Sequence, residues 1–467
     1  MIFRLALRSL LAHPIRTAVL AAGFGLGVSV MAALLGIGGV ILEQARAPEL
    51  VGGGDVVIGG VTGQVSSARF VTSGVLSAGP LASQVAVASP TVRANLYLID
   101  GQGSTPVRAR GGIPSLEQRL GDSETRGQSS WTDTTADRAW AAPQGDAVLR
   151  AMDRFHAIPD APGRAASWAE WLYFNGRGKD VRFYLTFLSG PRVSTDRRTI
   201  GVRLQLERGG RMTSYAASTE VDEKELLATA PDLTVGANRV RLDGALYRIA
   251  LDLPAETGAG HATATIALTA TPGQSLAPIV IRGAGGWLSG YTVPVMAGPL
   301  EGSIAVDGAT FDLSGADGYH DHNWGFWEGV RWQWGQVQGE GLSFVYGRVR
   351  PPSDAADPDR IPGFLAALGP DGPVGYATDV SIEETNDPVT NRPRHIVVRG
   401  HGESLALTLD MAIEQETSTA LRQGLFGAGL DFLQLRARYL VSGHAGDRSI
   451  NFTAAGSAET FRGGDRK

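Results

Sequence analysis

The segment that decides the fold reads Gly318-Tyr319-His320-Asp321-His322-Asn323-Trp324-Gly325. It brings a carboxyl group, two imidazoles and an indole together in a stretch typical of a β-strand. Successive side chains of an extended strand point to opposite faces, so this segment has two distinct sets of side chains. One predicted face carries Tyr319, Asp321 and Asn323, and the other carries His320, His322 and Trp324.

Hydrophobic residues after residue 168 recur at every second position, which is the pattern of half-buried strands. Gly369-Pro370-Asp371-Gly372 lies between two apolar runs and predicts a hairpin turn. Many such strands separated by turns favour closed antiparallel barrels, because closure leaves no exposed strand edge. The clearest alternating runs are Val202, Leu204 and Leu206; Leu405, Leu407, Leu409 and Met411; and Leu433, Leu435, Ala437, Tyr439 and Val441.

A second motif precedes the first and reads Trp168-Ala169-Glu170-Trp171-Leu172-Tyr173-Phe174-Asn175-Gly176. Together the motifs resemble the Asp-His-x-Trp-Gly and Glu-Trp-Trp-Tyr-x-x-Gly signatures of the AttH-like and carotenoid 1,2-hydratase (hydroxyneurosporene synthase) family. Leu172 stands where that family has its second Trp. Some fungal Diels-Alderase-like cyclases share the first signature. The resemblance covers about residues 168–462 and implies a mainly β fold with two lipocalin-like barrels in tandem.

Changes in composition and period divide the chain into segments. They are a cytoplasmic amphipathic segment at 1–16, a transmembrane helix at 17–42, a membrane-proximal region of unknown fold at 43–120, a linker with a short helix at 121–164, and lipocalin-like barrels at 165–316 and 317–467. Residues 85–87 and 96–99 are candidate strands of the membrane-proximal region. Asp146 is predicted to cap the short helix, whose apolar face carries Val148, Leu149, Met152 and Phe155.

Residues 17–42 form a run of 26 residues without a charge, which is long enough to span a hydrocarbon core of about 30 Å as a helix. Arg4, Arg8 and Arg16 precede this run, whereas only Arg46 follows it closely, so the positive-inside rule predicts a cytoplasmic amino terminus. The alternative is a signal peptide cleaved after Ala47, but the apolar run is longer than a signal core. We therefore predict a single-pass protein of the inner (cytoplasmic) membrane with extracytoplasmic, periplasmic barrels.

Small residues form a stripe along the predicted transmembrane helix, and such stripes allow another helix to approach closely. The stripe is Ala18, Ala22, Gly25, Ser29, Ala32, Gly36 and Gly39. Residues 5–55 are also similar to the first transmembrane helix of MacB/FtsX-type ABC-transporter permeases. This resemblance implies an ABC-transporter permease as the partner of the helix. The chain has no Walker motif and no second long apolar run, so it is not itself a transporter.

Composition excludes several kinds of function. A net charge of -5 gives no basic surplus for phosphates, so nucleic acid is not an expected partner. The absence of cysteine excludes disulfides, thiolate catalysis and Cys-ligated zinc. His320 and His322 have the spacing of metal ligands, but no further ligand stands near them in the sequence. We predict no metal and no other cofactor.

Burial of Asp321 in an apolar pocket would raise its pKa, so that it could deliver a proton to a carbon-carbon double bond or a carbonyl group. Tyr319 or His322 could position a water molecule, which completes the candidate catalytic set. Aromatic side chains would line a channel for the ligand and stabilise a developing carbocation. The candidate ligand-binding residues are Trp324, Trp327, Trp332, Glu170, Trp171, Tyr173, Trp287 and Tyr291.

Two interpretations of Asp321 stay open at this point: an acid catalyst, or a buried hydrogen-bonded brace at the barrel junction. The preferred prediction is a membrane-anchored lipocalin-like protein that binds an apolar small molecule, a lipid or an isoprenoid, beside an ABC transporter. The alternative is an isoprenoid hydratase, isomerase or cyclase that uses Asp321 as its general acid.

Overall fold

The computed structural model describes residues 83–100, 103–121, 130–142, 146–271, 274–370, 372–421 and 430–463, with a few isolated positions before residue 83. It divides into two units, Met1–Val65 with Val87–Ala141 and Ser66–Ala86 with Ala142–Lys467. The predicted transmembrane helix at residues 17–42 lies outside the described residues. Among those described, no helix has the length and apolar character needed to cross a membrane.

The first unit contains a β-hairpin and two short helices. β1 (Thr91–Asp100) pairs with β2 (Gly103–Gly112), and α3 (Pro114–Leu120) and α4 (Thr135–Ala141) follow. Pro114 suits the first turn of α3, where no N–H donor is needed, and Gly121 ends the helix with a φ of 75°. The strand predicted at residues 96–99 is confirmed inside β1, whereas residues 85–87 are irregular.

The second unit begins with α5 (Ala147–Asp153) and the single turn η3 (Ala165–Ser167), and continues as antiparallel sheet. The first sheet consists of β3 (Trp168–Arg177), β4 (Arg182–Ser194), β5 (Arg197–Arg208), β6 (Arg211–Asp222), β7 (Leu233–Val235), β8 (Asn238–Asp243), β9 (Leu246–Pro254), β10 (His261–Thr269), β11 (Leu276–Arg282), β12 (Leu288–Val306), β13 (Ala309–Asp312) and β14 (Ala316–Phe326). Its order is β6-β5-β4-β3-β14-β12-β10-β9-β8-β7, and β11 and β13 also pair with β12. A bridge from Tyr215 on β6 to Ala255 after β9 nearly closes this sheet into a barrel.

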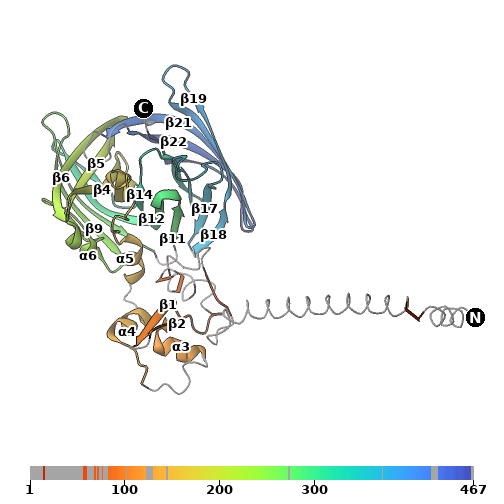
Figure 1. Cartoon of the computed structure of the whole chain (residues 1–467). Helices are drawn as coiled ribbons and strands as arrows, with labels where there is room; N and C mark the ends of the chain where they lie inside the picture. Colours follow the sequence, from red (N-terminus) through yellow and green to blue (C-terminus); the bar gives the residue numbers. More distant parts are fainter. Residues whose placement is uncertain are drawn as a thin grey trace, which may run out of the picture. The chain divides into compact units, whose positions relative to one another are not determined.

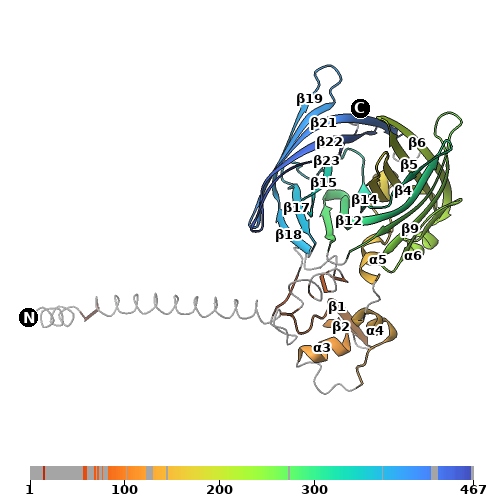
Figure 2. The ribbon, with the colours of Figure 1, turned by 180° about the vertical axis from the view of Figure 1, so that it is seen from behind.

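The second sheet consists of β15 (Arg331–Gly339), β16 (Leu342–Arg350), β17 (Phe364–Gly369), β18 (Gly372–Ala377), β19 (Asp379–Asn386), β20 (Pro393–Gly402), β21 (Leu405–Leu421), β22 (Leu430–Ala445) and β23 (Arg448–Gly463). Its order is β18-β17-β16-β15-β23-β22-β21-β20-β19, and β18 also contacts β20 and β21 across the remaining opening. Figures 1 and 2 show the two curved sheets of this unit, with β4, β5 and β6 in one and β17, β21 and β22 in the other. Two short helical segments, α6 (Glu223–Thr229) and η4 (Ala284–Gly286), lie between strands of the first sheet.

Three apolar clusters form the core of the second unit. One fills the first barrel, a second fills the second barrel, and a third, rich in Trp and Tyr, contains side chains from both sheets. The alternating positions predicted to be buried, such as Leu204, Leu409 and Leu435, are buried inside the barrels. Gly369 pairs with Gly372, so the predicted hairpin is also confirmed. The prediction of tandem antiparallel barrels is therefore confirmed.

The change from one sheet to the next falls later in the chain than predicted. We placed the second barrel at residues 317–467, but β14, which carries the motif, pairs with β3 and β12 of the first sheet. The second sheet begins only at Arg331. Alternation reports which face of a strand is buried and contains no information about its neighbours in the sheet, so it cannot locate this boundary.

The segment after α5 is packed into the first barrel, although residues 121–164 were predicted as a linker with a short helix. The helix itself begins after Asp146 as predicted, but the Asp146 carboxylate accepts a hydrogen bond from Arg150 (2.6 Å) instead of capping the helix. Leu149 and Phe155 belong to the core of the first barrel. Met152 and Asp153 are also buried, and they contact the motif on β14.

Candidate functional site

The two sequence motifs lie side by side because β3 pairs with β14. Asp321 stands opposite Tyr173, and Trp324 stands opposite Glu170. The side chains of β14 divide into two faces, as predicted. His320 and His322 point toward the core of the first barrel, whereas Tyr319, Asp321 and Asn323 contact residues of the cluster shared by both sheets.

On the first face, His320 is completely buried and bound at both ring nitrogens. Nδ1 lies 2.9 Å from the Tyr173 carbonyl oxygen, and Nε2 lies 3.0 Å from the Asp153 carboxylate. Nδ1 therefore donates to the carbonyl, and the hydrogen bond between Nε2 and Asp153 requires one further proton, on the imidazole or on the carboxyl group. The Tyr247 hydroxyl also donates to Asp153 at 2.5 Å, and Phe174 stacks on the His320 ring with centroids 4.0 Å apart. This arrangement is a buried, hydrogen-bonded His–Asp pair.

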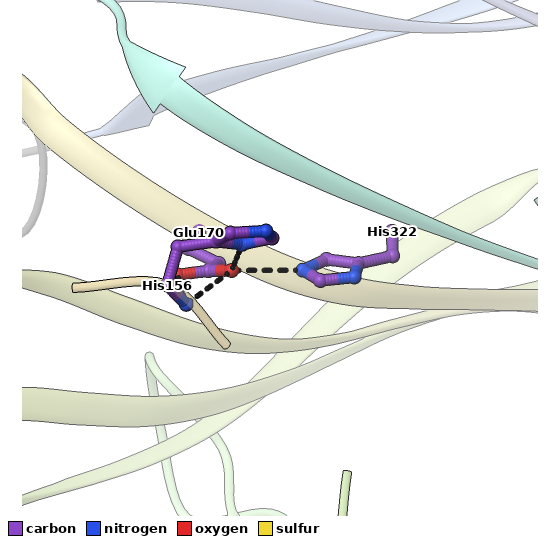
Figure 3. Close-up of side chains that lie close together, drawn as sticks. All are labelled: His156, Glu170 and His322. Carbon is purple, nitrogen blue, oxygen red and sulfur yellow. Dashed lines mark hydrogen bonds and ion pairs between the residues drawn. The ribbon is translucent and has the colours of Figure 1, made fainter. Parts of the chain in front are cut away.

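His322 forms a second cluster with Glu170 and His156, and Figure 3 shows both rings directed at the carboxylate. His322 Nε2 lies 3.1 Å from Glu170, His156 Nδ1 lies 2.6 Å from it, and the His156 backbone N–H also donates to it. Burial opposes the His322 cation, but the Glu170 carboxylate outweighs burial and raises the pKa of His322. Burial likewise raises the pKa of Glu170, while hydrogen bonds from both imidazoles lower it overall.

Among the described residues, the same three side chains are the candidate ligands for a metal ion, because one ligand atom from each lies within 4.8 Å of the others. Two imidazoles and a carboxylate are a known ligand set for zinc and iron. However, His322 Nδ1 faces the Met152 carbonyl oxygen at 2.8 Å, so a doubly protonated His322 satisfies every contact by hydrogen bonding. The cluster therefore needs no metal ion to explain its geometry, and the absence of a metal stays a prediction.

The second face of β14 carries a chain of hydrogen bonds that ends at Asp321. Trp334 Nε1 donates to the Tyr291 hydroxyl at 2.9 Å, Tyr291 and Tyr319 share a hydrogen bond of 2.7 Å, and Tyr319 donates to Asp321 at 3.0 Å. Asn323 donates to the other carboxyl oxygen at 2.8 Å. All of these side chains are buried.

Burial raises the pKa of Asp321 well above its usual value, and the nearby Glu459 carboxyl raises it further, although hydrogen bonds from Tyr319 and Asn323 oppose the shift. Burial also raises the pKa of Glu459 to about 8. Glu459 comes from β23 of the second barrel, so each barrel contributes one carboxyl group. Among the carboxyl groups of the described residues, Asp321 and Glu459 are the two whose pKa is raised.

The protonation state of Asp321 sets the direction of this hydrogen-bond chain. When Asp321 is ionised, each hydroxyl donates toward it, in the order Tyr291, Tyr319, Asp321. When Asp321 is protonated, it donates to Tyr319, which then donates to Tyr291. The Tyr291 oxygen still accepts from Trp334, so the Tyr291 proton becomes available to a group outside the chain. Proton transfer to a ligand is therefore chemically feasible here.

A polar cleft of about 210 Å³ opens beside this site. Its lining includes Asn175, Asp317, Gln336 and Ser457, one from each of β3, β14, β15 and β23. Two positions further along the same face of each strand lies a residue near Asp321: Tyr173 on β3, Tyr319 on β14, Trp334 on β15 and Glu459 on β23. We call these four residues, together with Asp321, the acid site. Two residues along a strand span about 7 Å, so the cleft ends one side-chain step from the acid site.

The predicted catalytic set is divided by the strand. Tyr319 and Asp321 are hydrogen-bonded, but His322 lies on the opposite face. Tyr173 and Tyr291 lie beside Asp321, and Glu170 joins the His322 cluster.

The predicted tryptophans have mixed positions. Trp324 stacks on His156, with ring centroids 4.5 Å apart. Trp327 donates to the Ala169 carbonyl and packs on Trp171, whereas Trp287 donates to the Phe326 carbonyl. Trp332 packs near Tyr291. These hydrogen bonds and ring contacts join neighbouring segments of the sheets.

Sequence reasoning missed Glu459, Asp153 and His156. Nothing in the local sequence marks Glu459, because its importance depends on a partner in the other barrel. Asp153 and His156 were considered part of a linker, although the apolar face of the preceding helix indicated that this segment is buried.

No protein-family model and no curated protein matches the sequence. Solved structures similar to this chain include an AttH-type protein from Nitrosomonas europaea, with 16% identity and a TM-score of 0.44, covering 66% of this chain and 99% of that one. Kievitone hydratase from Nectria haematococca has 13% identity and a TM-score of 0.42, covering 67% and 94%. CghA with Sch210972 has 13% identity and a TM-score of 0.37, covering 66% and 93%. Similarity at this level carries no information about residue roles.

Proposed function

We propose that this protein is an enzyme that protonates an apolar, unsaturated ligand between its two barrels, as a hydratase, isomerase or cyclase does. The observation that carries the proposal is the buried carboxyl pair of Asp321 and Glu459, for which burial raises both pKa values. Catalytic acids that work near neutral pH need such a raised pKa. Purely structural carboxylates are commonly ionised and paired with a cation, whereas no described Lys or Arg forms an ion pair with Asp321.

In the proposed hydration reaction, a proton passes from Asp321 through Tyr319 and Tyr291 to one carbon of the double bond. The other carbon becomes cationic, and the faces of Trp334 and the neighbouring tyrosines stabilise it. A water molecule then attacks the cation, the ionised Asp321 regains a proton from that water through the same two hydroxyls, and an alcohol forms. Loss of a proton from the cation gives isomerisation instead, and attack by a second double bond gives cyclisation.

Deuterium incorporation tests this proposal without knowledge of the natural substrate. We would incubate the full-length protein with farnesol or squalene in D2O and analyse the products by mass spectrometry. An acid-catalysed addition or isomerisation places deuterium on carbon, whereas a binding protein returns unlabelled ligand. Repeated failure to incorporate deuterium into ligands that bind would leave binding, and not catalysis, as the function.

A pH experiment tests the role of Glu459. Because its pKa is raised to about 8, the native state holds a proton that the unfolded chain releases near pH 4.5. The free energy of unfolding therefore falls as pH rises from about 4.5 to 8, by about 1.4 kcal/mol per pH unit for one such group. Glu459→Gln should reduce the slope measured by urea denaturation at pH 5 to 8 by about 1.4 kcal/mol per pH unit, whereas Glu403→Gln on an exposed turn should leave it unchanged. Equal slopes in the wild type and Glu459→Gln would contradict the assignment.

We also propose that the protein is anchored in the inner membrane, with its barrels outside the cytoplasm and a permease as partner. The uncharged run at residues 17–42, the arginines before it and the small-residue stripe support this proposal. Alkaline phosphatase fused after Lys467 should be active, and Gly25→Leu with Gly36→Leu should prevent a permease from co-purifying. An inactive fusion would contradict the orientation, and unchanged co-purification would contradict the helix contact.

A further inference from the structure

The cleft between the barrels contains a buried arginine without an ion-pair partner among the described residues. Arg182 is 7% exposed, and its NH1 donates to the Tyr184 hydroxyl at 3.4 Å and the Gly456 carbonyl at 3.3 Å. Both partners are neutral and both hydrogen bonds are long. Glu207 stands opposite Arg182 on β5 and its charge acts on Arg182 from beyond ion-pair distance, whereas Glu207 pairs directly with Arg436. A guanidinium in this environment favours an anion beside it.

A second donor points into the same cleft. Asn175 is 5% exposed, and its Nδ2 makes no hydrogen bond of standard geometry to the described residues; the Tyr173 hydroxyl lies near enough to accept from one of its two N–H groups, which leaves the other available. Its Oδ1 accepts from Gln336 Nε2 at 3.1 Å, which fixes the orientation of the amide. Arg177 and Asp317 also line the cleft, so the charges there are two positive and one negative. A buried amide N–H without a partner costs free energy unless a ligand accepts from it.

We propose that this cleft binds the carboxylate of an amphipathic ligand, with Arg182 as its ionic partner and Asn175 as a second donor. The planar guanidinium matches a carboxylate and binds it more strongly than it binds a neutral acceptor. The cleft volume of about 210 Å³ suits a head group with a short stem, whereas sites for whole drug-sized ligands have volumes of roughly 300 to 1,000 Å³. The apolar remainder of the ligand then extends toward Asp321. Only this last step rests on the proposed function.

Ligands that differ only in the head group test the anion site. We would titrate the full-length protein at pH 8 with oleate, methyl oleate and oleyl phosphate below their micelle concentrations, and follow tryptophan fluorescence. The wild type should bind oleate at least 10-fold more tightly than methyl oleate. Arg182→Gln should weaken oleate binding by about 10- to 100-fold and leave the affinity for methyl oleate unchanged.

Arg241→Gln is the matched control, because it removes the same charge from an exposed position on β8, outside the cleft. If Arg182→Gln does not fold, Asn175→Asp provides the test, since it adds a negative charge to the cleft and should also weaken oleate binding. The proposal would be overturned if the wild type bound oleate and methyl oleate with equal affinity. It would also be overturned if the folded Arg182→Gln protein preferred oleate over methyl oleate as strongly as the wild type does. Tighter binding of oleyl phosphate than of oleate would overturn the carboxylate assignment. A carboxylate preference without deuterium incorporation would support this site and contradict the proposed function.

Discussion

Asp321→Asn should lower the rate of deuterium incorporation by about 10²-fold or more, while ligand affinity and melting temperature stay close to those of the wild type. The amide has the shape of the protonated carboxyl group. It can accept from Asn323 and donate to Tyr319, as protonated Asp321 does. What it lacks is a proton that can be transferred. Single-turnover kinetics and thermal melting of the same samples would separate these effects.

A bracing role for Asp321 predicts a different result. If the ionised carboxylate only holds Tyr319 and Asn323 in place, its replacement should cost roughly 1 to 3 kcal/mol, and any loss of activity should follow the unfolded fraction. Asp243→Asn is the control, because Asp243 lies at the exposed end of β8. A variant with normal stability, normal ligand binding and normal turnover would contradict both interpretations.

Asp153→Ala should destabilise the two-barrel unit by about 3 to 5 kcal/mol, which is the largest stability effect that we expect. The change removes the hydrogen-bond partner of the completely buried His320 ring, and it removes the acceptor of the Tyr247 hydroxyl. Each of these two buried polar groups is then left without a partner, and each such loss costs about 1 to 3 kcal/mol. Urea denaturation followed by tryptophan fluorescence would measure the loss.

Two further variants make this test specific. Asp146→Ala, at the start of the same helix, removes a partly exposed i,i+4 pair with Arg150 and should cost less than about 1 kcal/mol. Asp153→Leu combined with His320→Phe should recover much of the lost stability, because apolar replacement of a whole buried pair is often neutral. A cost for Asp153→Ala as small as that for Asp146→Ala would show that the end of α5 is not part of the barrel core.

Local patterns in the sequence were sufficient to predict the barrels and the two faces of β14. Alternation predicted which residues of β5, β21 and β22 are buried, because one face of a strand in a barrel is always dry. The same two-residue period of a strand predicted that Tyr319 and Asp321 lie on one face, where they form a hydrogen bond. Burial of Asp321 was expected from its aromatic surroundings, and this is the physical cause of its raised pKa.

The features that were missed depend on contacts between distant parts of the chain. Glu459 becomes important only because its carboxyl group, on β23 of the second sheet, lies near enough to Asp321 to raise the pKa of that residue, and no local pattern specifies this proximity. Asp153 lies in a segment whose turns and prolines resemble a linker, and its role becomes visible only beside His320. The predicted set of Asp321, Tyr319 and His322 was divided because adjacency in sequence places His322 on the opposite face.

We expect Asp321 to be protonated at neutral pH inside the site between the barrels. Infrared spectroscopy of the full-length protein at pH 7 measures this directly, since a protonated carboxyl group has a C=O stretching band distinct from that of a carboxylate. Wild-type protein should show the band of a buried protonated carboxyl group, and Asp321→Asn should lose one component of that band. A wild-type spectrum at pH 7 from which Asp321→Asn removes only carboxylate intensity would contradict the account.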